Sequence, residues 1–221
     1  MKLVSPLFSQ LMVFREDNVV SIVIENQKCF YGLIEDISLQ MEGNRGQAVL
    51  SKDNVPIPFS KNAELIQCFV PFTANNKALL GKIAAEMERT GMDEAHYLKT
   101  QTILSEIERY VMELAFDLAC EVTADKLSLA SILKACSITI AETGSTNLER
   151  ILDYMILVRE LERDKLFVFV NMRSYFSDEG MEAFISSVLD HKLKVLLIES
   201  SERARLPHEQ RLTIDADWCE I

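Results

Sequence analysis

Runs of almost uninterrupted apolar residues constrain the fold of this chain more than any other feature. They cover residues 19–24, 166–170 and 193–198, and a shorter run at 212–215 follows. Strands that are apolar on both sides are buried on both faces, which is typical of a parallel sheet covered by helices. We therefore expect an α/β fold built on a parallel sheet, with 212–215 as an edge strand.

A long helical block separates the first run from the others. Apolar residues recur every three or four positions from about 75 to 135, which predicts a helix over 76–89 and a long one over 92–124. At ~1.5 Å per residue the long helix would reach roughly 45–50 Å, so it should protrude or pack on another chain. We predict a discontinuous α/β head domain, residues 1–73 and 148–221, with an inserted α-helical leg domain, residues 74–147.

An open parallel sheet raises the question of nucleotide binding at the carboxyl ends of its strands. A phosphate loop needs Gly-x-x-x-x-Gly-Lys-Ser/Thr. The only Gly-Lys pair, Gly81-Lys82, lies in a predicted helix, and the first strand is followed by Glu25-Asn26-Gln27-Lys28, without a glycine. Neither a Gly-x-Ser-x-Gly motif nor a zinc-protease histidine pair is present. Nucleotide binding and catalysis are therefore disfavoured.

Four acidic residues recur at every fourth position of the predicted long helix: Glu113, Asp117, Glu121 and Asp125. Residues four apart lie on one helix face, where like charges repel. Carboxylate oxygens suit Ca²⁺, which takes about six to eight oxygen ligands, and Glu142 could approach the same region. The residues alone leave two interpretations open, a calcium site or a solvated acidic face.

The formal net charge of −11 argues against nucleic-acid binding, because phosphates are neutralised by concentrated Lys and Arg. A DNA-binding hypothesis therefore needs basic residues gathered on one face, or bound cations that cancel part of the negative charge. Lys28, Lys99, Lys126 and Lys134 lie on or next to the helical block and are the candidates. Ordinary surface charge is the alternative for each of them.

The cellular location is expected to be the cytoplasm. Five widely spaced cysteines include no Cys-x-x-Cys pair, which indicates free thiols in a reducing compartment. No run of about 18 apolar residues is present, so no membrane span is expected. The first residues do not resemble a signal peptide.

Three segments together resemble a known family. They are Ser60-Lys61-Asn62-Ala63-Glu64-Leu65-Ile66 followed by Pro71-Phe72, then Leu166-Phe167-Val168-Phe169-Val170-Asn171-Met172-Arg173-Ser174-Tyr175, and Leu196-Leu197-Ile198-Glu199 with the ending Ile214-Asp215-Ala216-Asp217-Trp218-Cys219-Glu220-Ile221. In these segments the chain resembles the accessory spacer-acquisition protein of type II-A CRISPR systems, the Csn-type adaptation protein. The most specific motif is Phe-Val-Asn-x-Arg-Ser-Tyr, and the helical block is similar in pattern more than in residues.

The resemblance implies a non-catalytic DNA-binding protein that supports spacer acquisition. Its head would resemble a phosphate-loop ATPase that has lost its nucleotide motifs, with the helical leg inserted. Four copies would form a ring with a positively lined hole, through which linear double-stranded DNA threads from its ends without sequence preference. Calcium, and no nucleotide, would bind in the leg region. The partners would be the CRISPR integrase pair and the effector nuclease.

By this resemblance the calcium role falls on the four-residue ladder, with Glu142 as a further candidate ligand. Two other classes of function stay open. One is an enzyme, either a degenerate nucleotide-binding ATPase or a nuclease that uses paired carboxylates with a metal ion. The other is a protein-only assembly scaffold without DNA contact.

Overall fold

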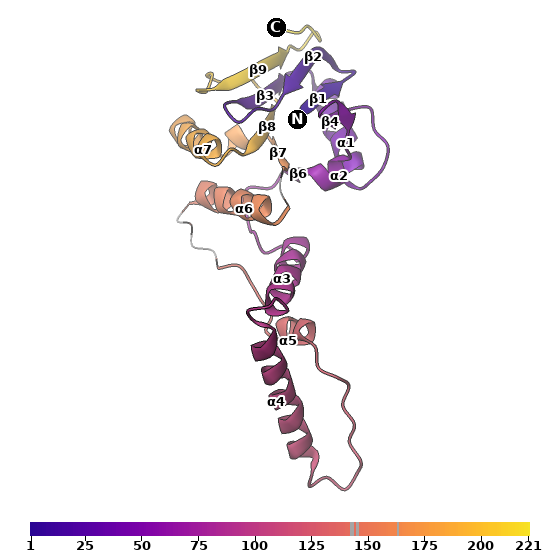
Figure 1. Ribbon diagram of the computed structural model, residues 1–221. Helices are drawn as coiled ribbons and strands as arrows, with labels where there is room; N and C mark the ends of the chain where they lie inside the picture. The colour runs from indigo at the N-terminus through magenta and orange to yellow at the C-terminus, as the bar shows by residue number, and fades with distance from the viewer. Residues whose placement is uncertain (142–143, 145, 163) are drawn as a thin grey trace. The chain divides into compact units, whose positions relative to one another are not determined.

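The computed structural model describes residues 1–141, 144, 146–162 and 164–221. The chain divides into two compact units, whose elements are labelled in Figure 1. Unit 1 contains Met1–Phe72 and Thr143–Ile221, and unit 2 contains Thr73–Glu142. In the sequence, unit 2 is therefore an insertion into unit 1.

Unit 1 is built on a five-stranded parallel sheet, as the apolar runs predict. In spatial order its strands are β6 (Ala63–Ile66), β7 (Leu166–Val170), β8 (Lys194–Glu199), β3 (Val19–Ile24) and β9 (Glu209–Ile214). Every neighbouring pair is parallel. Strands β3 and β7 are buried at every position, which explains their unbroken apolar sequences, and β9 lies at an edge as expected.

The strand order reverses between β3 and β8. From β3 the chain travels to β6 at one edge and returns through β7 to β8, and from β8 it crosses β3 to reach β9. Open α/β sheets bind ligands outside the carboxyl ends of their strands at such a reversal. Val23 of β3 is paired with Glu199 of β8 there, so this edge of the sheet is the natural place for a site.

Different elements cover the two faces of the parallel sheet (Figure 1). One face packs on α1 (Gln27–Met41) through Cys29, Leu33 and Ile37, and α2 (Phe59–Asn62) lies beside α1. The other face packs on α7 (Asp178–Asp190), which also contacts α6 (Asn147–Glu162). Phe184 of α7 meets Phe169 of β7 edge to face, with ring centroids 6.0 Å apart.

A small antiparallel sheet completes unit 1, and the sequence pattern indicates it less clearly than the parallel sheet. Its spatial order is β2 (Phe8–Val13), β1 (Lys2–Ser5), β4 (Val49–Lys52) and β5 (Val55–Pro56). The pattern of β2 is weak because its three central residues are all exposed, and only Phe8 and Met12 are buried. Without strict alternation such a short strand leaves little trace in the sequence.

The described residues of unit 2 form three helices, α3 (Lys77–Gly91), α4 (Tyr97–Ala115) and α5 (Leu129–Ala135). Asn76 and Ser128 cap α3 and α5 with side-chain oxygens that accept first-turn N–H groups. A Cβ at Gly91 would meet the end of the Leu129 side chain of α5, so any larger residue at this position would require Leu129 to move. Before α3, the Asn75 side chain bonds both the N–H and the carbonyl of Ile140, at 2.7 and 3.1 Å.

The predicted helix over 92–124 is wrong in extent. Helix α4 covers 19 residues, which is about 28 Å long, and residues 116–128 are not helical. A continued helix would place the acidic ladder at its carboxyl end. Negative charges there oppose the helix macrodipole and repel one another at a spacing of four, and the last turn of α4 has no basic residue to compensate.

Candidate functional site

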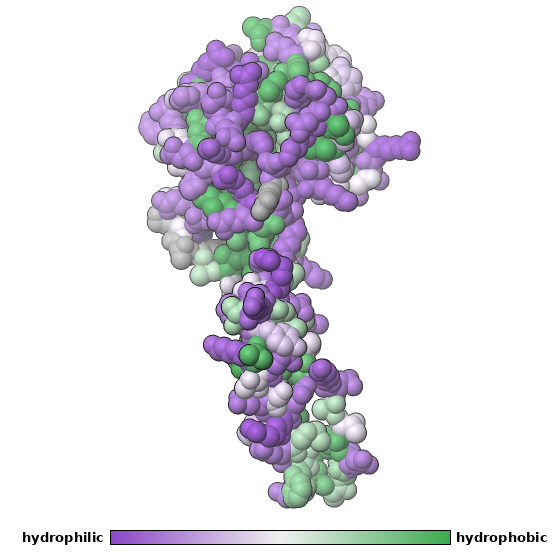
Figure 2. All heavy atoms as spheres, in the orientation of Figure 1, coloured by the Kyte–Doolittle hydropathy of each residue, from purple (hydrophilic) through white to green (hydrophobic). Residues whose placement is uncertain are grey.

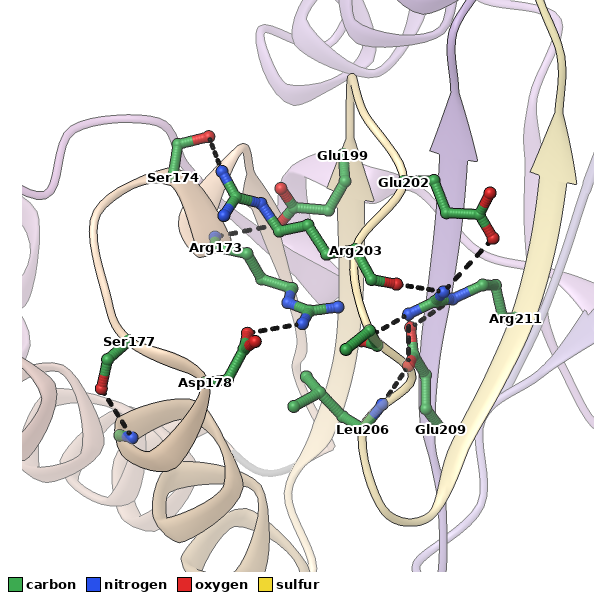
Figure 3. A network of polar contacts seen from close by, with 12 residues as sticks. Arg173, Ser174, Ser177, Asp178, Glu199, Glu202, Arg203, Leu206, Glu209 and Arg211 are labelled. Carbon is green, nitrogen blue, oxygen red and sulfur yellow. Dashed lines mark hydrogen bonds and ion pairs between the residues drawn. The ribbon is translucent and has the colours of Figure 1, made fainter.

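A network of charged side chains extends from the carboxyl edge of the parallel sheet, beside the reversal of strand order, to the first residues of β9 (Figure 3). It joins Glu199 at the end of β8, Arg173 in the 3-10 turn η1 (Met172–Ser174) after β7, and the pair Glu209 and Arg211 on β9. Glu199 and Arg173 are each 2% exposed. Charged groups buried this deeply need partners.

The turn after β7 places Arg173. Asn171 adopts a left-handed backbone conformation with φ 54°, and its side chain accepts a hydrogen bond from the Ser200 N–H at 2.8 Å. The Arg173 backbone N–H then donates to Glu199 Oε1 at 3.2 Å, and Arg173 Nη2 pairs with Asp178 Oδ1 at 2.8 Å. The Nε–H of Arg173 finds no hydrogen-bond partner among the described residues.

The carboxyl group of Glu199 binds its proton more tightly than an exposed glutamate does. Burial raises the pKa of Glu199 to about 7, although the Arg173 N–H and the positive charges of Arg173 and Arg203 act in the opposite direction. The negative charge of Glu209 adds to the increase. Near neutral pH, protonated and ionised forms of this buried carboxyl therefore coexist.

The Glu209–Arg211 pair fixes the loop 200–208 that connects β8 to β9 (Figure 3). Arg211 donates to the carbonyl of Arg203 at 2.7 Å, to the carbonyl of Ala204 at 3.2 Å and to Glu209 Oε2 at 2.8 Å. Glu209 in turn accepts the Leu206 N–H at 2.7 Å. These bonds satisfy the Glu209 and Arg211 side chains locally and hold the loop backbone to β9.

The start of α1, which follows β3 at the same edge, is not arranged as a phosphate cradle. Backbone N–H groups at a helix start bind phosphate when they are available. Here the Asn26 side-chain oxygen accepts the N–H groups of Lys28 and Cys29, both at 3.1 Å. Glu25 precedes this cap and adds a negative charge, which would repel a phosphate.

The predicted metal ligands are not brought together among the described residues. Glu113 lies in the last turn of α4, where its Oε1 is 3.6 Å from Arg109 Nε. Asp117, Glu121 and Asp125 lie beyond the helix and are exposed, so the expected single helix face does not exist. No group of three His, Cys, Asp or Glu residues in the described part of the chain could hold a metal ion. Glu142 falls outside the described residues.

The four predicted DNA-contacting lysines are all exposed. Lys28 lies in the first turn of α1 in unit 1. Within unit 2, Lys99 lies near the start of α4, Lys126 precedes α5, and Lys134 lies in the last turn of α5. Lys134 also borders a cavity of about 380 Å³ lined by residues of α3, of α5 and of the segment that follows α5.

One face of α4 is apolar and exposed. Ile103, Ile107, Tyr110 and Leu114 follow one another at spacings of four, three and four, and their exposed fractions are 42, 37, 60 and 63%. We call these four residues the α4 stripe. Figure 2 shows hydrophobic residues over the part of unit 2 that contains the end of α4 and the residues after it, and Phe116 there is 86% exposed.

One protein-family model matches most of the chain. A family model described as CRISPR-associated protein (Cas_Csn2) matches residues 40–218. The chain belongs to the Cas_Csn2 family. The match extends from β4 through β9 and includes all of unit 2, and it confirms the resemblance read from the sequence. No curated protein matches the chain.

Membership in the Cas_Csn2 family implies a role in CRISPR adaptation. No helix among the described residues has both the length and the apolar character needed to cross a membrane.

The proximity of Glu199 and Arg173 in this Cas_Csn2 chain was not predicted from the sequence. Glu199 directly follows the apolar run 193–198, and Arg173 follows the run 166–170 after two residues. A charged residue at the end of a buried parallel strand lies at the edge where ligand sites form. That position was the available signal, and we used both residues only as parts of a family motif.

Proposed function

We propose that this Cas_Csn2 chain forms a homotetrameric ring that binds the ends of double-stranded DNA without sequence preference and without catalysis. In this proposal unit 2 is the leg that contacts other copies, and the ring supports spacer acquisition beside the CRISPR integrase pair and the effector nuclease. Family membership supplies the adaptation role. The observation that carries the assembly is the exposed α4 stripe.

The α4 stripe has the spacing of a helix that pairs with another helix. Apolar residues at i, i+4, i+7 and i+11 form a single seam along a helix, and a contiguous exposed apolar patch marks a protein contact. Apart from Ala74, Leu79 and Leu104, the described residues of unit 2 include no buried hydrophobic side chain. A second copy offers the same seam, and paired identical patches are the usual basis of symmetric oligomers.

Assembly is tested by placing a charge on the α4 stripe. Ile107→Glu should reduce the sedimentation coefficient to that of a smaller species, because a carboxylate would be buried in the contact. Ser105→Glu is the matched control: it adds the same charge to an exposed position of α4 on another face. Equal effects of both variants, or a lone protomer in the unaltered protein, would remove the assembly from the proposal.

The DNA part of the proposal depends on exposed lysines in an otherwise acidic chain. Contacts to phosphates carry no base information, so binding through Lys28, Lys99, Lys126 and Lys134 would be independent of sequence. Each phosphate contact adds about 0.9 to the slope of log affinity against log salt. Lys134→Ala should therefore weaken binding of all duplexes alike and lower the slope by about 1.

DNA-end binding is tested with a mobility-shift assay on one duplex sequence in linear and closed circular form. We expect the linear form to shift at low salt and the circular form to stay free, because a closed ring admits DNA only from an end. Equal shifts for both forms would contradict threading. Intact rings that shift neither form would favour the protein-only scaffold.

Calcium belongs to the proposal because carboxylate oxygens are the ligands it prefers. The candidates are Glu113, Asp117, Glu121 and Asp125, with Glu142 as a further candidate ligand. Because these carboxylates are not gathered among the described residues, binding would require residues 116–125 to rearrange. Sedimentation with calcium and with a chelator tests the claim, and identical profiles would remove calcium from the proposal.

The absence of catalysis is supported by the start of α1, where Asn26 occupies the N–H groups that a phosphate would need. We expect neither ATP retention on filters nor DNA cleavage with Mg²⁺. Cleavage that is lost in Glu113→Ala would favour a metal-dependent nuclease, and retained ATP would favour the degenerate ATPase.

A further inference from the structure

Arg173 lies between two carboxyl groups and its guanidinium satisfies only one of them. Its Nη2 pairs with Asp178 Oδ1 at 2.8 Å, and its backbone N–H contacts Glu199 Oε1 at 3.2 Å. The Nε–H is buried and finds no partner among the described residues. An unpaired buried donor is destabilising, so an alternative position of the guanidinium in which this donor is hydrogen-bonded would be close in free energy.

The groups around Glu199 decide when that alternative is favoured. Arg173 faces it from η1, Arg203 from the loop 200–208 and Glu209 from β9. Arg211 is already committed to Glu209 and to two carbonyl groups. While Glu199 is protonated it needs no counter-ion, and Arg173 is free to hold Asp178. An ionised Glu199 is a buried charge that needs a cation.

We propose that Arg173 is a proton-operated latch, which pairs with Asp178 when Glu199 is protonated and with Glu199 when Glu199 is ionised. The proton of Glu199 leaves to solvent, Arg173 stays charged, and the half-exposed Asp178 returns to water, where its charge is tolerated. The latch is a property of unit 1 alone and does not depend on the ring.

The latch would act on the start of α7. Asp178 is the first residue of that helix, and Ser177 caps it by accepting the Gly180 N–H at 3.2 Å. Tyr175, Phe176 and Ser177 line a cavity of about 490 Å³ together with residues of α6 and α7. Loss of the Arg173–Asp178 contact would loosen this wall, so pH near neutrality would control the shape of the cavity.

The first test follows the Glu199 carboxyl by NMR from pH 5 to 9 in protein labelled at the glutamate side chains, with Glu199→Gln identifying the signal. In Asp178→Asn, Arg173 loses its competing partner, so the midpoint of Glu199 should fall by about one pH unit. Glu179→Gln is the control, because it removes the neighbouring charge in the same turn without contacting Arg173. An equal fall in both variants, or no fall in Asp178→Asn, overturns the latch.

The second test measures hydrogen exchange at residues 176–181, corrected for the intrinsic effect of pH. The unaltered protein should lose protection there between pH 6 and 8, and Glu199→Gln should keep it. Equal losses in both proteins would overturn the coupling to α7. Fluorescence of Trp218 at both pH values verifies that each variant is folded.

Discussion

Replacing Glu199 by Gln should make the stability of unit 1 much less dependent on pH. Gln has nearly the same shape and can still accept the Arg173 N–H through its carbonyl oxygen, but it cannot ionise. In the unaltered protein, burial raises the pKa of Glu199 from 4.5 to about 7. The folded state therefore holds this proton more tightly than the unfolded chain does.

The sign and size of the effect follow from proton linkage. Below pH 4.5 both states are protonated and the group contributes nothing to the pH dependence. Between 4.5 and 7 the unfolded chain loses the proton first, so the free energy of unfolding falls as pH rises. A difference of about 2.5 pH units corresponds to about 3 kcal/mol, of which about 2–3 kcal/mol is lost between pH 5 and pH 8.

Urea unfolding at pH 5 and pH 8 measures this loss, with the single tryptophan, Trp218, as a probe located in unit 1. The unaltered protein should lose about 2–3 kcal/mol more than Glu199→Gln over this range, or about 5–10 °C in melting temperature. Glu202→Gln, in the adjoining loop 200–208 and 60% exposed at its side chain, should behave like the unaltered protein. Parallel stability curves for Glu199→Gln and the unaltered protein would refute the reasoning.

Three further substitutions test the packing and the ion pairs. The carboxylate of Asp164 is hydrogen-bonded by the ammonium groups of Lys52 and Lys194, which lower the pKa of Asp164 to about 2. Its contribution to the free energy of unfolding is present above pH 3.8 and is lost as pH falls toward 2. Asp164→Asn should therefore cost about 1 kcal/mol at pH 7, after allowance for solvent exposure, and urea unfolding at decreasing pH should show the two proteins approaching equal stability. Phe169→Ala removes a fully buried ring of the sheet and should cost about 3–5 kcal/mol in urea unfolding; a cost below 1 kcal/mol would contradict the packing described. Gly91→Ala should weaken the α3–α5 contact, seen as faster hydrogen exchange in α5, and unchanged exchange would argue against the close approach.

The sequence predicts the parallel sheet well because a strand that is buried on both faces consists almost entirely of apolar residues. The fully buried strands β3 and β7 can be located from their apolar runs alone. Helix starts are equally local, and Ser128 and Ser177 cap the helices where their side chains bond first-turn N–H groups. The antiparallel strands β1 and β2 left no comparable trace because one side of them faces solvent.

The candidate site was predictable only in part, because it depends on where chain segments meet. The spacing of Glu113, Asp117, Glu121 and Asp125 suggested one helix face, yet the same spacing concentrates repulsion at a helix end. The apolar residues after Ala115 keep a helical spacing, so the sequence pattern gave no sign that this repulsion would end the helix. Glu199 is a different case, since its proximity to Arg173 arises from β8 and β7 being neighbours in the sheet.

Because the described residues of unit 2 bury so few apolar side chains, its folding should depend on protein concentration. A segment of this size with three buried apolar side chains among its described residues cannot offset the conformational entropy of its own chain. If neighbouring copies supply the missing burial, dilution alone should melt the insertion while the β-sheet unit keeps its melting temperature. Thermal denaturation of this protein should then separate into two steps, of which only the first moves with protein concentration.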